Sequence, residues 1–483
     1  METLQRTANR GSVSTGFNIN NSLKLEDDNT ENLYRALNGS TSTTKFTVSM
    51  WFKRTELGAS QLLYHRGVAG NEGVFLRTST ETNDALQVDI GGSSTNSRSY
   101  TSALLRDTSA WYHAVLAVDT TQSTATNRFK LYLNGNLITD FASRANPAED
   151  FAMEVSSAKH RHGAYNDTDG YAGYCGYIAE CHYIDGSQVA QTEFGEFDED
   201  SGIWKPKAYT GTYGNNGCYM KYNDSSALGA DSSGNGNTFT LNNISAADQA
   251  TDTPTNNFAT LSPLNTESNG GGNVGYTEGA TKAVSLAADE PASGSMAITK
   301  GKWYFECKAF SNSEIMAGWG VPNLWGTSTD NPGNDEYSFA VHPIGRVYYY
   351  GNTYIDFSPS VTFDTNDIVS VAIDADNGFC YWAKNGTYMN NATPTSGATG
   401  TGGFNYIGGT TGANMKIVDG DFLVPAFRVN YYTNSGILLN FGGYTTISIS
   451  SAASDANGYG TFEYAPPTGY YALCTKNLAL YGG

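Results

Sequence analysis

Hydrophobic and polar residues alternate over short stretches along most of the chain. In FTVSMWF (46–52) and RFKLYLNG (128–135), apolar residues recur at every second position, so that one face of each stretch is hydrophobic. This period of two is typical of a half-buried β-strand. Because helical periodicity is nearly absent, the pattern predicts a nearly all-β protein.

Asn-Gly pairs separate several apolar stretches, at 134–135, 377–378 and 385–386. Both central residues of a type I′ turn need a positive φ, which Asn and Gly tolerate, so each pair predicts a tight hairpin. Short strands joined by such turns at regular spacing favour an antiparallel sandwich or jelly roll.

Four ordered motifs occupy the C-terminal half: GKWYFE at 301–306, AGWG at 317–320, DADNGFCYWAKNG at 374–386 and LLNFG at 438–442. Their order and spacing resemble a SPRY domain. This resemblance implies a β-sandwich that binds partners through its loops and performs no chemistry.

The N-terminal half contains a second set: FTVSMWFKR at 46–54, WYHAVLAVDTT at 111–121, FKLYLNGNLI at 129–138 and GYIAECHYIDG at 176–186. Over roughly residues 13–205, these motifs resemble the core strands of a laminin G or concanavalin A-like lectin domain. The combination of this half, the stretch 194–243 and the SPRY-like half is similar to structural proteins of tailed marine bacteriophages.

We therefore predict two concanavalin-like antiparallel β-sandwich (jelly-roll) domains in tandem. The expected boundaries are an N-terminal arm at 1–12, a laminin G/concanavalin A-like domain at 13–245, a linker or crossover at 246–299, a SPRY-like sandwich at 300–442 and a C-terminal extension at 443–483. The linker prediction depends on the abundance of Gly, Pro, Thr, Ser and Asn in that segment.

Charge restricts the classes of partner. The formal net charge of -19 repels polyphosphate, so nucleic-acid binding is disfavoured. The sequence has no apolar run near the ~18 residues of a membrane span, and residues 1–17 lack the apolar core of a signal peptide. We expect synthesis in a host cytoplasm, no membrane insertion and final localisation in a virion.

The six cysteines predict free thiols rather than disulfides. Cys175 and Cys181 are six residues apart in one strand-like segment, which puts them beyond the ~7 Å Cα separation that a disulfide bridges. Cys307 and Cys380 occupy apolar positions of alternating stretches, where a buried thiol behaves as a small hydrophobic group.

An acidic run raises the possibility of glycoside hydrolysis, because paired carboxylates perform that reaction. The run comprises Glu193, Glu196, Asp198, Glu199 and Asp200. Gly195, Gly202 and Pro206 interrupt it, which favours a solvated loop. The chain also lacks a Ser-His-Asp context, a Walker loop and a dinucleotide fingerprint, so we predict no enzymatic activity.

Two groups of residues are candidate metal ligands. Asp119, Asp167 and Asp169 are oxygen donors of the kind that calcium prefers, and laminin G relatives bind calcium on a loop rim. His160 and His162 would share one face of a strand, as in some zinc sites. Neither set is complete, so the sequence predicts no resident cofactor and leaves calcium as the alternative.

The candidate partner-binding residues are Trp325, Tyr337, Arg346, Tyr348 and Tyr350. Trp325 stands in a polar loop, where an aromatic side chain is either a binding anchor or folds back onto the core. In GRVYYYGNTY, alternation places Arg346, Tyr348 and Tyr350 on one face of a strand.

The resulting hypothesis is a non-enzymatic phage virion protein, a fibre, decoration or adhesin, that attaches to host-surface glycans. The alternatives are a purely structural module that binds neighbouring virion proteins and, third, a polysaccharide depolymerase. Single glycan sites are weak, so we expect a homo-oligomer, most simply a trimer.

Overall fold

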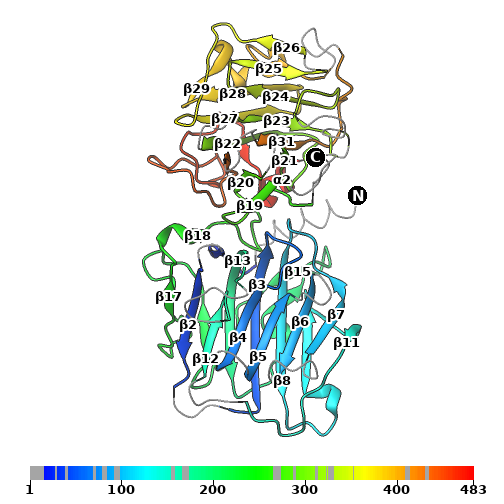
Figure 1. The fold of residues 1–483 in the computed structure, drawn as a ribbon, viewed down its shortest axis with the longest axis vertical. Helices are drawn as coiled ribbons and strands as arrows, with labels where there is room; N and C mark the ends of the chain where they lie inside the picture. Colours follow the sequence, from blue (N-terminus) through cyan, green and yellow to red (C-terminus); the bar gives the residue numbers. More distant parts are fainter. Residues whose placement is uncertain are drawn as a thin grey trace. The chain divides into compact units, whose positions relative to one another are not determined.

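The computed structural model describes residues 16–27, 30–38, 42–68, 72–78, 84–91, 98–153, 158–165, 173–264, 274–286, 290–310, 314–322, 324, 331–351, 353–407, 414–429 and 435–482. The chain divides into two compact units, Met1–Asn256 and Asn257–Gly483. Figure 1 shows both as antiparallel β-structures, which confirms the predicted fold class.

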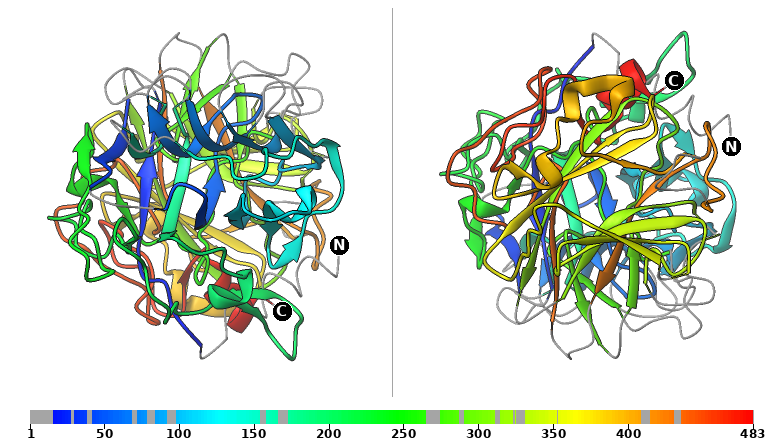
Figure 2. Two further views of the ribbon diagram at one scale, coloured as in Figure 1. Left: turned by 90° about the horizontal axis from the view of Figure 1, so that it is seen from below. Right: turned by 90° about the horizontal axis from the view of Figure 1, so that it is seen from above.

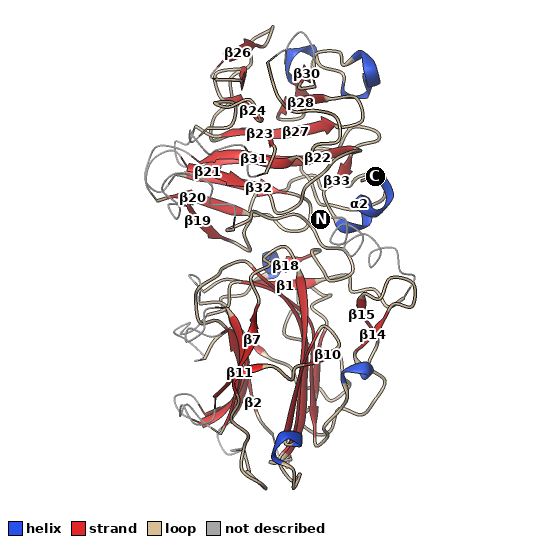
Figure 3. Cartoon of the chain, turned by 90° about the vertical axis from the view of Figure 1, so that its right-hand side faces the viewer, coloured by secondary structure: helices blue, strands red, loops and turns tan. Residues whose placement is uncertain are grey.

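Two eight-stranded sheets form the first unit. In sheet A the order is β10 (Asn136–Leu137), β9 (Phe129–Leu133), β8 (Trp111–Asp119), β3 (Lys45–Arg54), β13 (Gly176–Asp185), β1 (Ser22–Leu25) and β18 (Gln249–Ala250), and β16 (Cys218–Met220) also pairs with β13. In sheet B the order is β11 (Phe141–Ser143), β7 (Arg98–Leu104), β6 (Ala85–Ile90), β5 (Glu72–Thr78), β4 (Leu62–Val68), β12 (Lys159–His162), β2 (Asn32–Ala36) and β17 (Thr240–Asn242). Figure 3 shows these sheets as two facing layers. A separate hairpin joins β14 (Gly195–Phe197) to β15 (Trp204–Pro206).

The second unit is also built from two sheets. Sheet C has the order β19 (Val274–Thr277), β20 (Lys282–Ser285), β32 (Gly436–Asn440), β22 (Lys302–Phe310), β27 (Ile368–Asp374), β28 (Phe379–Lys384) and β29 (Thr387–Tyr388), with β30 (Phe404–Asn405) on β28 and β33 (Tyr471–Ala472) on β22. Sheet D has the order β21 (Glu290–Ser293), β31 (Val424–Val429), β23 (Met316–Gly320), β24 (Ser338–His342), β25 (Arg346–Tyr349) and β26 (Thr353–Asp356).

Helices are few and short in the described residues. One α-helix, α2 (Thr475–Tyr481), follows β33 and is red in Figure 2. Single turns of 3-10 helix connect strands: η2 (Ala125–Asn127), η3 (Gln191–Glu193), η4 (Ala246–Asp248), η5 (Met389–Asn391) and η6 (Pro394–Thr399). No helix of the described chain has the length and apolar character of a membrane span.

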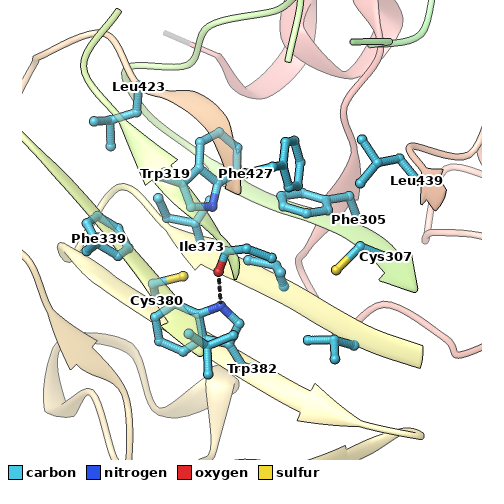
Figure 4. Packing of buried hydrophobic residues seen from close by; sticks show 14 of the residues in the cluster. Phe305, Cys307, Trp319, Phe339, Ile373, Cys380, Trp382, Leu423, Phe427 and Leu439 are labelled. Carbon is cyan, nitrogen blue, oxygen red and sulfur yellow. Dashed lines mark hydrogen bonds between the residues drawn. The ribbon is translucent and has the colours of Figure 1, made fainter. Parts of the chain in front are cut away.

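Each unit encloses its own hydrophobic core. In the second unit, Trp319, Phe305, Trp382 and other side chains from sheets C and D interdigitate (Figure 4). Trp382 is 1% exposed, and its indole Nε1 donates to Ala317 O at 2.9 Å. This hydrogen bond offsets the cost of removing the indole N–H from water.

The segment expected as a linker or crossover is divided between the two units. Residues 249–250 form β18 beside β1, and the Asp252 carboxylate accepts from the buried Lys53 ammonium at 2.8 Å. Residues 274–293 supply β19, β20 and β21 to the second unit. Their polar composition reflects short strands and turns. The C-terminal extension adds β33, which pairs in parallel with β22, and α2.

The six cysteines are all described, and all are buried free thiols. Cys175 directly precedes β13, whereas Cys181 lies within that strand.

Candidate functional site

The sheet face around β25 combines exposed aromatic and charged side chains. Along β24, β25 and β26 successive side chains point to opposite faces of the sheet, and Val341, Val347 and Ile355 occupy one inward row. The next residues of the same strands point outward. As the alternation predicted, Arg346 and Tyr348 lie on one face of the sheet and Val347 on the other.

The three strands lie side by side (Figure 1), and their register forms two outward rows of residues. One row contains Tyr348 opposite Tyr354, and the other contains His342, Arg346 and Asp356. The Tyr348 ring centroid lies 5.7 Å from that of Tyr354 and 5.4 Å from that of His342. We call these five residues the outer patch.

Arg346 is the electrostatic centre of the outer patch. Its guanidinium carbon lies 3.9 Å from the centroid of the Tyr354 ring, and its Nε lies 2.9 Å from Asp356 Oδ1. A hydrogen bond with Tyr348 and the nearby Asp356 charge raise the pKa of Arg346, although partial desolvation opposes them. The patch is open, because Tyr354 is 47% exposed and the Asp356 side chain 61%.

The remaining predicted binding residues lie at different places. Tyr350 follows β25 with a left-handed φ of 42° and is 37% exposed, so it extends the exposed surface at the hairpin end. Tyr337 is partly buried and packs against the interior core, which separates it from the outer patch. Trp325 lies outside the described residues.

Three members of the outer patch were not predicted as site residues: His342, Tyr354 and Asp356. They join Arg346 and Tyr348 only through the pairing of β25 with β24 and β26. The signal that could have found them is the alternation of SFAVH (338–342) and TYID (353–356), read together with two assumed hairpins.

The predicted calcium ligands are only partly described. Asp119 ends β8, where its carboxylate accepts from Thr121 Oγ1 at 2.6 Å and Gln122 Nε2 at 2.8 Å and pairs with Lys45 Nζ at 3.2 Å. Burial by itself raises its pKa, but these hydrogen bonds prevail and lower the pKa of Asp119 to about 2. Asp167 and Asp169 lie outside the described residues, so the calcium site stays a prediction.

The two candidate zinc histidines, His160 and His162, are buried on β12. His160 Nδ1 lies 2.7 Å from Tyr64 Oη, and the His162 ring packs against Phe239 with centroids 5.3 Å apart. Burial lowers the pKa of both rings, that of His162 to about 4. Both rings are therefore neutral parts of the core at pH 7.

The acidic run forms part of a hairpin that ion pairs with one lysine stabilise. Glu196 on β14 and Asp198 after it both pair with Lys205 Nζ on β15, at 3.4 and 3.3 Å. Ser201 donates to Asp198 from its backbone N and its hydroxyl, which lowers the pKa of Asp198 to about 2. The arrangement is that of a surface turn whose carboxylates share one cation.

A serine and a histidine on sheet A resemble a nucleophile and its base. Ser49 Oγ lies 2.8 Å from His113 Nε2, and Trp204 Nε1 donates to His113 Nδ1 at 2.9 Å. Indole nitrogen is only a donor, so Nδ1 carries no proton and the neutral ring has its proton on Nε2. His113 therefore donates to Ser49 and cannot take its proton.

On the face of sheet B that points away from the core, a row of polar side chains is buried from solvent. Arg161 Nη1 lies 3.1 Å from His65 Nδ1, and Gln87 Nε2 donates to Asp89 Oδ1 at 2.9 Å. These four residues are at most 2% exposed. Their hydrogen bonds stabilise the sheet, and they offer no open surface to a ligand.

Comparisons with known proteins agree with both halves of the fold. Residues 27–182 match the family model of the concanavalin A-like lectin/glucanases superfamily, and residues 302–442 match that of the SPRY domain. The chain contains a concanavalin-like domain followed by a SPRY domain. The outer patch belongs to the SPRY domain. No curated protein matches the sequence.

Several solved structures match parts of the chain. Stonustoxin shares 16% identity at a TM-score of 0.27, over 38% of this chain and 27% of that one. The PSpry domain of TRIM65 shares 13% identity at a TM-score of 0.27, over 38% and 91%. A Bacteroides ovatus protein described as carbohydrate-binding shares 17% identity at a TM-score of 0.32, over 47% and 59%. None of these likenesses carries a functional argument.

Proposed function

We propose that this chain is a non-enzymatic glycan-binding protein and that the outer patch is its contact surface. The observation that carries the proposal is the exposure of Tyr354 and Asp356 beside the partly exposed Tyr348 and Arg346 on one sheet face. Tyrosine rings stack on the C–H faces of sugars at low entropy cost, while the guanidinium and carboxylate hydrogen-bond to hydroxyl groups.

The concanavalin A-like lectin match at residues 27–182 supports a carbohydrate ligand for the chain as a whole. Within that class we infer attachment of a tailed marine bacteriophage to host-surface glycans, as a fibre, capsid decoration or adhesin. The virion role depends on the resemblance stated in the sequence analysis, that of the domain combination to structural proteins of marine phages. The partners would be other virion proteins and identical copies, because a shallow patch binds usefully only when several copies act together.

An alternative from another class is a purely structural module of the virion. Ile344, in the turn between β24 and β25, is 44% exposed next to the outer patch, and such apolar area also suits a protein neighbour. A depolymerase ranks third, because Glu196 and Asp198 share Lys205 instead of facing a substrate.

Binding of the purified full chain to an array of microbial glycans tests the proposal. We expect Tyr354→Ala to weaken binding at least tenfold, about 1.4 kcal/mol. Tyr34→Ala is the matched control, because its partly exposed ring in the first unit also lies under a cation, Lys159 Nζ, at 4.7 Å. Equal losses in both variants, or binding unchanged by Tyr354→Ala, would contradict the proposed surface. Absence of binding to any glycan would favour the structural module.

A further inference from the structure

We propose that Glu26, Asp27, Glu56 and Cys175 bind a divalent cation of the zinc class at one end of sheet A. In the described part of the chain, Glu26, Asp27 and Cys175 form the one group of three potential metal ligands whose ligand atoms all lie within 4.8 Å of one another. The proposed glycan surface, in the other unit, does not involve this group.

Strand register brings the ligands together. β1 and β3 both pair antiparallel with β13, so that Leu25, Gly176 and Arg54 occupy one row across three strands. Glu26 directly follows β1, and Cys175 directly precedes β13. Because both neighbours of β13 run in the same direction, the residues that follow β1 and β3 meet the residue that precedes β13.

The thiol of Cys175 lies among more carboxylate oxygens than its one proton can bond. Its Sγ lies 3.0 Å from Glu26 Oε1 and 3.1 Å from Asp27 Oδ1, and Glu56 also hydrogen-bonds with it. A thiol has one proton, so one of these contacts at most is an S–H···O bond at a time. Burial, with the charges of Glu26, Glu56 and Asp27, raises the pKa of Cys175. A bound cation would turn this repulsion among the donor atoms into attraction.

A buried amide beside Glu56 supplies an independent indication. Gln61 is 0% exposed, and its Nε2 donates to Glu56 Oε2 at 2.6 Å, so its amide is in contact with Glu56. The Oε1 atom of this amide has no hydrogen-bond partner. Buried acceptors are almost always satisfied, by a donor or by a cation with its bound water. The Gln61 amide also orients Glu56 as a ligand.

The donor set selects the class of cation. Zinc accepts thiolate and carboxylate together, whereas calcium and magnesium take oxygen donors. With Zn–S near 2.3 Å and Zn–O near 2.0 Å, sulfur and oxygen ligands of a tetrahedral ion lie about 3.5 Å apart. The S···O distances of 3.0 and 3.1 Å need to open by only a few tenths of an ångström. On binding, the S–H bond breaks, sulfur bonds to the cation and the proton passes to solvent.

Titration of the purified full chain with Cd²⁺, followed by its thiolate charge-transfer absorbance, tests the site, and Zn²⁺ calorimetry gives the stoichiometry. We expect one ion per chain, loss of the absorbance change in Cys175→Ala and at least tenfold weaker binding in Glu56→Gln. Cys307→Ala is the matched control, because this thiol is equally buried in the second unit. It should bind as the unchanged chain does.

If the Cys175→Ala variant does not fold, metal binding by Glu56→Gln tests the proposal instead. Glu56 is only partly buried, so this variant is expected to fold. The proposal is overturned if the unchanged chain gives no thiolate signal, if Cys175→Ala keeps it, or if Glu56→Gln binds normally. Glycan binding by the outer patch is a separate readout, so loss of one activity leaves the other measurable.

Discussion

Three buried histidines should make the first unit, residues 16–256, sensitive to mild acid. His113, His160 and His162 are at most 4% exposed, and burial is the main cause that lowers the pKa of each. The values are about 3 for His113 and about 4 for His162. The second unit contains only His342, which is partly exposed.

The sign follows from proton uptake by the unfolded chain. Well above pH 6.5 these histidines are neutral in both states, so their protonation does not oppose folding. As the pH falls below 6.5, the unfolded chain gains protons that the folded chain excludes, and stability is lost until the folded pKa is reached. At pH 5, about 1.5 pH units below an unfolded pKa of ~6.5, each histidine costs about 2 kcal/mol, or about 6 kcal/mol for three.

Urea denaturation at pH 7.5 and 5.0, with mass-spectrometric proteolysis to assign each transition to a unit, measures this effect. We expect the urea midpoint of the first unit to fall by roughly 2 M. This is the loss of about 6 kcal/mol in unfolding free energy divided by a denaturant dependence of about 3 kcal/mol per M. His113→Gln should reduce this fall by about a third. The control His342→Gln should not change it. Burial raises the pKa of Glu56, so protonation of this carboxyl opposes the loss of stability at low pH. Its contribution is the same in each of these variants. An equal midpoint at both pH values would refute the reasoning.

Three further predictions concern packing and chemistry. Trp382→Ala should destabilise the second unit by about 3–5 kcal/mol, because it leaves a cavity and removes the hydrogen bond of the indole to Ala317 O; a urea midpoint shift worth less than ~1 kcal/mol would contradict this. Gly176→Ala should destabilise the first unit by about 2 kcal/mol or more, since the new Cβ would lie 2.1 Å from Lys53 O at a φ of 145°; unchanged thermal unfolding would refute that close approach. We expect no depolymerisation of polysaccharide; reducing-end release that disappears in Glu196→Gln or Asp198→Asn would show that these acids are catalytic.

The local sequence pattern was sufficient to predict the strands and most turns. The hairpins at Asn134-Gly135 and Asn385-Gly386 have positive φ at both residues, as type I′ geometry requires. At the third Asn-Gly pair only Gly378 has a positive φ, because a longer turn forms in which Gly378 N donates to Asp374 O at 2.9 Å. The alternation in β25 likewise predicted that Arg346 and Tyr348 share one face and Val347 lies on the other.

Contacts between distant residues could not be read from the chain. Tyr354 joins Arg346 because of strand register, and Cys175 meets Glu26 although 149 residues separate them. Segment 246–299 resembles a linker in composition because short strands and turns bury few large side chains. Site prediction from one sequence therefore identified two of the five residues of the outer patch, the two that lie on a single strand.

A crystal structure of the full chain with a glycan selected from the array would test the central claim most directly. Our account predicts a sugar ring stacked on Tyr354, about 4 Å above the tyrosine ring, with hydroxyl groups hydrogen-bonded to Arg346 or Asp356. A sugar bound elsewhere, with the outer patch unoccupied or covered by a neighbouring chain in solution, would contradict it.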